Sequence, residues 1–192
     1  MLALPLLLLG AALVGCSSDE QKIQEHIAAA ERYVEEEDLR SALVEYRSAL
    51  ALQPKDAELN HRIALVYTGL GQTARAAFYF GEAYRLDPTR IEAALAQAPV
   101  FYSSDPDAAE ALVKEVLEKA PESALAHARY AEVLLVRADT EGALAEALTA
   151  VELDPDSLIA RRVGATVRRS IIRENHLLGR TADARVYEAG VE

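Results

Sequence analysis

Residues 57–90, AELNHRIALVYTGLGQTARAAFYFGEAYRLDPTR, form a unit that also occurs immediately before them in the chain. Moving the unit back by 34 residues pairs Tyr67 with Tyr33, Ala76 with Ala42, Phe80 with Tyr46, Ala83 with Ala49 and Pro88 with Pro54. A fixed period of this length is the signature of a repeat architecture. The chain is therefore expected to consist of stacked copies of one small unit.

Each unit is predicted to contain two helices. In residues 57–90, apolar residues recur at helical spacing on both sides of Gly69-Leu70-Gly71, which marks a turn. Asp87 and Pro88 end the second helix, because proline has no N–H group with which to continue it. A single pair of antiparallel helices cannot bury both of its faces, so neighbouring copies must stack.

The unit resembles the tetratricopeptide repeat. The residues that carry the resemblance are Tyr67, Gly71, Ala76, Phe80, Ala83 and Pro88. In that family, small side chains lie where two helices approach closely, and large ones fill the space beside them. The resemblance implies an all-α fold, an α-solenoid of about four helix pairs followed by a lengthened, incomplete fifth. It leaves the function open, because one scaffold fold hosts many functions.

The repeats are expected at residues 23–56, 57–90, 91–123 and 124–156, and residues 157–192 are expected to form a basic long helix and a partial fifth repeat or cap. The third repeat is degenerate, because Pro99 interrupts its first helix and no Tyr-Gly pair marks its turn. Its second helix is clear, since Asp105 supplies an N-cap and Pro106 follows at the first helical position.

The C-terminal part reads as one long helix over residues 158–178. From Gly179 the chain is expected to turn into a second helix that runs through Tyr187 and lacks a closing proline. This last unit is either a natural cap or part of a longer repeat array.

The N-terminus contains an apolar run, LALPLLLLGAALV at residues 2–14, that is too short to span a membrane and suits the core of a secretory signal. It ends at Cys16, the only cysteine, in a tetrapeptide that resembles a bacterial lipobox. The resemblance implies a signal peptide at residues 1–15, acyl chains such as palmitate on Cys16, and a linker at 16–22. Ser17 then favours the outer membrane, with the repeats in the periplasm.

Two readings of this N-terminus stay open. Cys16 is either lipidated or an inert residue of a hydrophobic helix. No Lys or Arg opens the apolar run, so the true start codon can lie upstream of Met1.

The charge is unevenly distributed. Residues 17–156 carry 13 Lys and Arg against 27 Asp and Glu, whereas residues 157–192 carry seven against four. The long helix is predicted to have a basic face formed by Arg161, Arg162, Arg168, Arg169 and Arg173. Nucleic-acid binding by this face conflicts with the formal net charge of -11 and would require the signal to be spurious. We therefore expect no nucleic-acid partner.

The sequence contains no catalytic or metal-binding constellation that we can identify. The four histidines, His26, His61, His127 and His176, lie in separate repeats, outside any HExxH motif, and are interpreted as partly buried packing residues. The abundant carboxylates are typical of solvated helix faces. We expect no enzymatic activity, no metal, no cofactor and no small-molecule substrate.

The resemblance also implies a concave groove lined by the first helix of each pair. Carried over position by position, the groove residues are Ile27, Glu31, Val34 and Glu35, then His61, Leu65 and Thr68, and finally Ala128, Glu132, Leu135 and Val136. The mapping does not extend to the third repeat. The Lys and Asn pattern with which some family members clamp a C-terminal carboxylate is absent from these positions, which disfavours acidic C-terminal peptides.

A mixed apolar and acidic groove suits a protein segment with basic residues. The alternative is a groove that stays empty in this chain.

Phe78 is expected on the outer face of the second repeat. Its counterparts by repeat register are Val44 and Ala145, and Phe80 takes the core position that Tyr46 holds in the first repeat. Two aromatic residues this close in sequence cannot share one helix face. Phe78 is therefore a candidate for a partner contact, and the alternative is that it lies against its own helix or is partly buried.

Together these features predict a lipid-anchored periplasmic adaptor that binds protein partners. Similar lipoproteins support the assembly of pili and outer-membrane proteins, the recruitment of peptidoglycan enzymes, and exopolysaccharide export, and the sequence does not choose among them. The alternative is a non-catalytic repeat domain of a longer envelope enzyme or export protein, which the unfinished last repeat supports.

Overall fold

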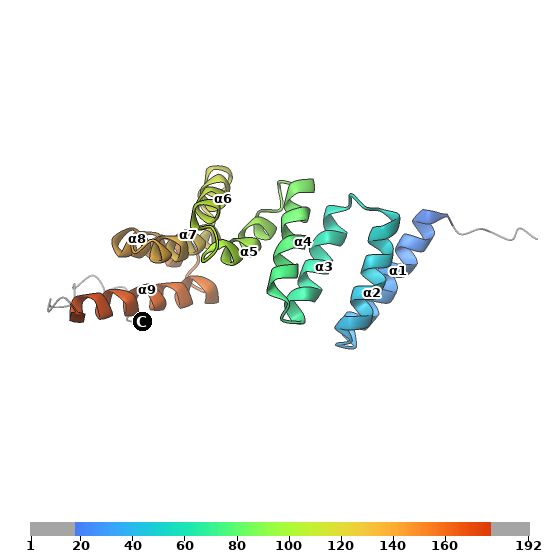
Figure 1. Ribbon diagram of the computed structural model, residues 1–192, viewed down its shortest axis with the longest axis horizontal. Coiled ribbons are helices and arrows are strands. Elements are labelled where there is room, and N and C mark those ends of the chain that lie inside the picture. Colours follow the sequence, from blue (N-terminus) through green and yellow to red (C-terminus); the bar gives the residue numbers. More distant parts are fainter. Residues whose placement is uncertain (1–17, 178–192) are drawn as a thin grey trace, which may run out of the picture.

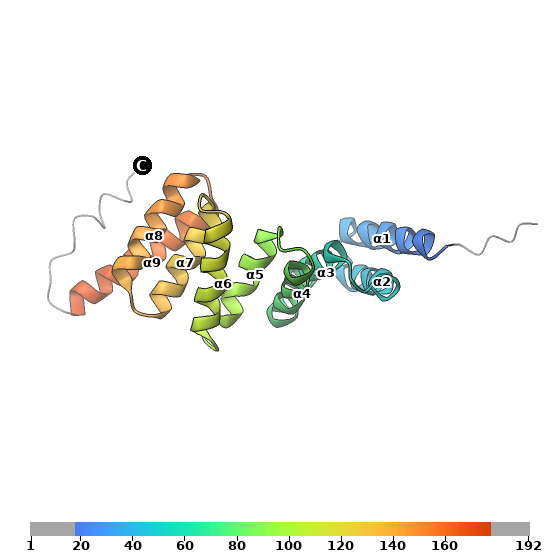
Figure 2. The same cartoon turned by 90° about the horizontal axis from the view of Figure 1, so that it is seen from above.

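The computed structural model describes residues 18–177, and within this range it contains nine α-helices and no strand. The helices are α1 (Asp19–Glu35), α2 (Leu39–Leu52), α3 (Ala57–Gly69), α4 (Thr73–Leu86), α5 (Ile91–Phe101), α6 (Pro106–Lys119), α7 (Ala124–Val136), α8 (Thr140–Leu153) and α9 (Leu158–Leu177). The first eight form four pairs that follow one another along the molecule (Figures 1 and 2), and α9 packs on α7 and α8. The predicted all-α solenoid of helix pairs is confirmed.

Side-chain caps fix the start of most of these helices. The capping residues are Ser18, Asp38, Asp56, Asp105, Ser123 and Asp139, and each accepts a hydrogen bond from the backbone N–H three residues later. Such a cap stabilises a helix by about 1 kcal/mol. The Ser18 cap explains why α1 begins at Asp19, inside the segment that the sequence predicts to be a linker. The predicted cap at Asp105, with Pro106 behind it, is present.

The turns inside three of the pairs share one backbone conformation. Glu37, Gly71 and Ala138 occupy equivalent positions and have φ values of 60°, 70° and 60°. The residue after each donates its N–H to a carbonyl five residues back, at 2.8, 2.9 and 2.9 Å, as in a Schellman motif. Among the residues described, the third pair has no positive φ in its turn, which matches its missing Tyr-Gly pair.

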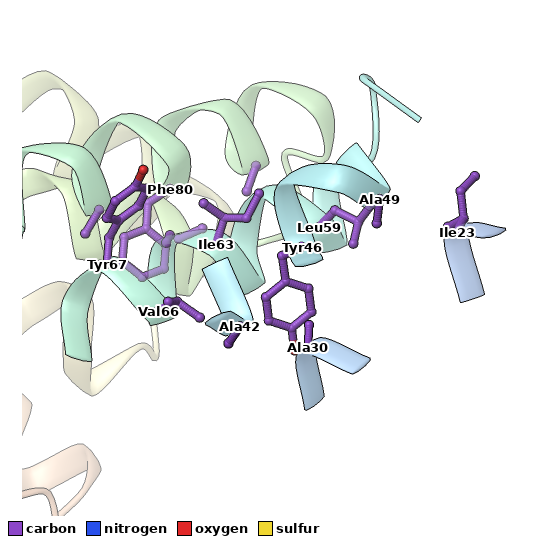
Figure 3. Packing of buried hydrophobic residues seen from close by; sticks show 14 residues of the cluster. Ile23, Ala30, Ala42, Tyr46, Ala49, Leu59, Ile63, Val66, Tyr67 and Phe80 are labelled. Atoms are coloured by element: carbon purple, nitrogen blue, oxygen red, sulfur yellow. The ribbon is translucent and has the colours of Figure 1, made fainter. Parts of the chain in front are cut away.

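The interior consists of three apolar cores. The first joins α1 to α4 with the start of α5, the second joins α5 and α6 with part of α7, and the third joins α7, α8 and α9. In the first core (Figure 3), Tyr46 and Phe80 take equivalent positions and are buried beside alanines. The same position later in the chain holds Val113 and then Ala147, so this position is aromatic only in the first two repeats.

The course of α5 differs from the prediction. Pro99 is expected to interrupt the helix, but α5 continues to Phe101, so this prediction is wrong. Proline removes the bond that its own N–H would donate and crowds the carbonyl four residues back, but Pro99 lies in the last turn of α5, where only two more helical residues follow. The weak point is the packing, because α5 contacts α6 over a smaller interface than the other pairs share.

The direction of the helices changes around the third repeat. In Figure 1, α1 to α4 stand steeply in the view, whereas α9 runs nearly horizontally, and in Figure 2 both α8 and α9 are oblique. The single helix α9 over Leu158–Leu177 agrees with the predicted helix over residues 158–178. The predicted second helix, from Gly179 through Tyr187, lies outside the described residues.

Candidate functional site

The predicted groove residues form rows when the repeats are aligned in register. The predicted Val34, Thr68 and Leu135 share one row with Tyr102 and Arg169, and the predicted Glu31, Leu65 and Glu132 share another with Thr166. The structure forms a pocket at each end of these rows, one between α1 and α3 and the other between α7 and α9.

The pocket between α1 and α3 is mostly apolar, and we call it the apolar notch. Its volume is about 140 Å³, and its lining consists of Val34, Leu39, Tyr46, Arg62, Leu65 and Val66. Val34 is 39% exposed and Leu65 is 53% exposed, although Tyr46 and Val66 beside them are buried. The notch therefore presents apolar surface to solvent at a place where an apolar side chain can enter.

A chain of ion pairs borders the notch and crosses the repeat boundary. Arg62 pairs with Glu31 of α1 and, at 2.6 Å, with Glu58 of its own helix, while Arg90 pairs with Glu58 at 2.8 Å. Burial would raise the pKa of Glu58, but hydrogen bonds from Arg62 and Arg90 outweigh this and hold it below its usual value. The negative charge of Glu31 is thus neutralised by Arg62, so the surface beside the notch is less acidic than the sequence suggests.

Three other predicted groove residues have different surroundings. His61 lies edge-on against Phe80, with ring centroids 5.4 Å apart, and its Nδ1 is buried with no hydrogen-bond partner in the described structure. Burial lowers the pKa of His61, so the imidazole is neutral at pH 7. Ile27 is half-buried against the first core, whereas Glu35 is exposed at the end of α1. His61 and Ile27 therefore have packing roles.

The other two inner histidines join the helices of their pairs. His26 Nδ1 is 2.6 Å from Glu45 Oε2, and His127 Nδ1 is 2.6 Å from Glu146 Oε2. These contacts link α1 with α2 and α7 with α8 at equivalent positions. They agree with the interpretation of the histidines as partly buried packing residues.

A cluster of polar side chains surrounds Glu132 of α7. Tyr102 donates its hydroxyl hydrogen to Glu132 Oε2 at 2.7 Å, and Arg129 donates to the same oxygen at 2.7 Å. Arg162 of α9 lies 3.9 Å from the other carboxylate oxygen. Burial and the adjacent Glu132 raise the pKa of Tyr102, which therefore stays protonated. The mapping from sequence omits Tyr102, although its register, 34 residues after Thr68, marks it as a groove position.

The pocket between α7 and α9 is basic, and we call it the basic pocket. It has a volume of about 330 Å³ and is lined by Leu135, Thr166, Arg169, Ser170 and Arg173. Arg169 Nη2 donates to Thr166 Oγ1 at 3.3 Å. Among residues 18–177, neither Arg169 nor Arg173 forms an ion pair with a carboxylate. The structure thus unites Leu135, predicted in the groove, with two arginines predicted on a separate basic face.

The predicted basic face is divided. Arg162, Arg169 and Arg173 lie on the side of α9 that meets α7, as shown by their proximity to Glu132 and by the pocket lining. Arg161 instead donates to the backbone oxygen of Asp156 at 3.4 Å, and Arg168 is half-buried. The five arginines of the predicted basic face therefore have different surroundings, and the role of that face stays a prediction.

Phe78 projects from the outer side of α4. It is 63% exposed, whereas Phe80 is 6% exposed. Its ring meets Tyr79 edge-on at 5.2 Å, and Tyr79 stacks on the buried Tyr67 at 5.4 Å. Val44, the register equivalent of Phe78 on α2, is also largely exposed. A partner contact at Phe78 stays a prediction.

Within the described range, no group of three or more His, Cys, Asp or Glu side chains could hold a metal ion. The same range contains no helix that is both long and apolar enough to cross a bilayer. Cys16, the predicted lipidation site, lies outside the described residues.

The paired helices, the repeated Schellman turns and the row of groove positions define a helical-repeat scaffold. Two family models, both described as tetratricopeptide repeat, match residues 57–90 and 101–162. The chain belongs to the tetratricopeptide repeat family. No curated protein is significantly similar to the sequence.

Solved structures support the same fold. MamA 41-end from Desulfovibrio magneticus RS-1 superposes with a TM-score of 0.72 at 17% identity, covering 90% of this chain and 95% of that one. YrrB, described as a TPR protein with an unusual peptide-binding site, gives a TM-score of 0.63 at 22% identity and 73% coverage of both chains. A Thermobaculum terrenum O-GlcNAc transferase mutant gives 0.56 at 20% identity, covering 72% of this chain and 27% of that one.

Proposed function

We propose that this protein is a lipid-anchored, non-catalytic adaptor of the bacterial cell envelope that binds a protein partner in its groove and supports assembly of an envelope machine. The observation that carries the proposal is the apolar notch, where Val34 and Leu65 stay exposed beside buried neighbours. Pockets that admit one apolar side chain supply much of the binding energy in protein interfaces. The peptide-binding site in the printed description of YrrB supports a similar use of this fold.

The partner segment carries an apolar side chain for the notch and basic residues beside it. Residues 35–38, Glu-Glu-Glu-Asp, directly follow Val34 and are all exposed. Glu31 is already compensated by Arg62, so the attraction for basic residues comes from this acidic turn. Complementary charge at the rim of an interface speeds association and fixes the register of the bound segment.

The proposed location rests on the N-terminal sequence. Acyl chains on Cys16 would anchor the protein, since each buried methylene contributes about 0.8 kcal/mol and two chains hold a protein stably at a membrane. Ser17 favours the outer membrane, with the repeats facing the periplasm.

The alternative is that the chain acts as a non-catalytic repeat domain of a larger envelope enzyme or export protein. It is favoured by the O-GlcNAc transferase, in which the matching region makes up only 27% of that chain. Reading the genomic frame beyond Glu192 separates the two possibilities, because a catalytic domain in the same frame would support the alternative.

Site-specific photo-crosslinking in the envelope tests the groove. A photoreactive residue at position 65 should capture a protein that the same residue at position 44 does not, because Val44 is similarly exposed but lies on α2, away from the notch. The variant Val34→Ser with Leu65→Ser should lose this partner, and Val44→Ser should keep it. Identical crosslinks at both positions would contradict the proposed site.

Fractionation of a Cys16→Ser variant tests the anchor. The variant should be soluble in the periplasm or remain uncleaved, because it has no sulfur to which the lipid can be attached. If it loses its first 15 residues and still partitions with membranes after a carbonate wash, the anchor is not the lipid.

A further inference from the structure

The two pockets of the groove occupy the same structural position but differ in charge. Each lies between the first helices of successive repeats, and Val34 and Leu65 of the notch correspond to Leu135 and Thr166 of the basic pocket. We propose that the basic pocket binds side-chain carboxylates of an acidic protein segment. This rests on the proposed function of the groove as a protein-binding surface.

Arg169 and Arg173 have no carboxylate partner among the residues that the structure describes, unlike several other arginines. Arg62, Arg90 and Arg129 are all bound to glutamates. In the part of the chain that the structure describes, Arg169 and Arg173 line a pocket and have no such partner. The chain carries 31 Asp and Glu against 20 Lys and Arg, so carboxylates are in excess, yet none of those described pairs with these two arginines.

The geometry of the basic pocket suits neighbouring carboxylates. Arg169 and Arg173 are four residues apart on α9 and therefore project from the same face, where two guanidinium groups can bind neighbouring carboxylates. Guanidinium binds carboxylate through two parallel hydrogen bonds, which are stronger than neutral ones. Arg169 is oriented by its bond to Thr166. Leu135 adds an apolar wall, so a segment in which acidic residues adjoin an apolar one fits best.

The charge beside the apolar notch is opposite to the charge of the basic pocket. The exposed acidic turn at residues 35–38 lies next to the apolar notch, and the unpaired arginines lie at the opposite end. A segment that spans both sites must carry its basic residues toward α1 and its acidic residues toward α9. The groove therefore selects a partner by the order of its charges and distinguishes it from segments of uniform charge.

Nuclear magnetic resonance of the ¹⁵N-labelled full chain tests the pocket directly. The probes are N-acetyl-Leu-Glu-Glu-amide, its Gln-Gln analogue, its Lys-Lys analogue and inorganic phosphate. The Glu-Glu probe should shift the amides of Leu135, Thr166 and Ser170, and the Gln-Gln and Lys-Lys probes should not. The Kd of the Glu-Glu probe should rise about tenfold in Arg169→Glu or Arg173→Glu, as expected when a charge-assisted hydrogen bond is lost.

Arg161→Glu is the matched control, since it makes the same change of charge on the same helix, outside the pocket. It should leave the affinity within about twofold, because exposed charges act weakly beyond the Debye length. If Arg169→Glu, Arg173→Glu and Arg161→Glu all lowered the affinity equally, the effect would come from net charge alone and the proposal would be overturned. Equal shifts with inorganic phosphate would assign the pocket to free anions and also overturn it.

An absence of shifts with every probe likewise overturns the proposal. These probes carry one apolar residue and do not extend to the notch. If the probes do not bind, the crosslinking result at position 65 still stands. If crosslinking at position 65 fails, the result for the basic pocket still stands.

Discussion

Ala138 has the same left-handed backbone conformation as Gly71, its counterpart two repeats earlier, with φ values of 60° and 70°. An L-residue with a side chain is disfavoured in this region, whereas glycine is not. Ala138 is held there because its turn closes by the same hydrogen bond, from Asp139 N–H to Leu134 O at 2.9 Å.

Replacing Ala138 with Gly should therefore stabilise the protein by about 0.5 to 1 kcal/mol. The substitution relieves backbone strain in the folded state, and part of this gain is offset because glycine raises the conformational entropy of the unfolded chain. Gly71→Ala should destabilise it by about 1 kcal/mol, through the backbone alone, because a Cβ at Gly71 meets no atom within 4 Å. Urea denaturation measures both. The control is Ala145→Gly, at an exposed position inside α8, which should cost about 1 kcal/mol. A destabilised Ala138→Gly variant would refute the strain argument.

Truncation should cost much less stability at Phe78 than at Phe80. Phe78→Ser should lower the free energy of unfolding by less than about 1 kcal/mol, because the ring is 63% exposed. Phe80→Ala should cost about 3 to 5 kcal/mol, since it leaves a cavity in the first core. Thermal melts compare the two. If the Phe78 variant unfolds as readily as the Phe80 variant, Phe78 is structural and its proposed partner contact must be abandoned.

The stability of the first core should depend on the charge of His61. Burial disfavours the imidazolium, so the pKa of His61 is lower in the folded protein than the usual 6.5. As the pH falls, His61 thus binds a proton in the unfolded chain before it does so in the folded protein. The neutral, buried His61 contributes fully to stability above pH 6.5, and this contribution is lost as the pH falls through the pKa of the folded state.

The measurement is urea denaturation between pH 7.5 and 5 of the wild type and of His61→Gln. Carboxylates contribute to both slopes, so the expected signal is a shallower loss of stability in the variant. Parallel curves for wild type and His61→Gln would show that His61 does not titrate differently on folding.

The third repeat should open before the second. Pro99 removes one helix hydrogen bond, the interface of α5 with α6 is small, and its turn lacks the Schellman conformation of the other pairs. In native-state hydrogen exchange, amides of residues 95–105 should therefore exchange before those of residues 74–86. Equal protection of the two segments would rule out a joint at this position.

Most of the fold could be predicted from sequence because its determinants are local. The 34-residue spacing, the turn at Gly71 and the proline after α4 each act within one repeat. Pro99 could not be judged in the same way, because its effect depends on where in the last turn it lies, and sequence locates helix ends only to within a few residues.

The groove was harder to predict because its properties arise between repeats. Arg62 compensates Glu31 across 31 residues, and Tyr102 reaches Glu132 across 30. Such pairs depend on how far one repeat is rotated against the next, which no single repeat specifies. The division of the arginines on α9 has the same origin, since only packing on α7 determines which of them enter the basic pocket.

The three separate cores have a consequence for cooperativity. In a linear array, contacts reach only the neighbouring repeat, so the molecule behaves as a short one-dimensional chain of coupled units in which one core can open before its neighbours. A partner segment that engages both the apolar notch and the basic pocket would bridge the weakest unit from outside. We expect the free protein to melt in steps and the bound protein to melt in one transition, because the partner segment would connect the repeats on both sides of the third.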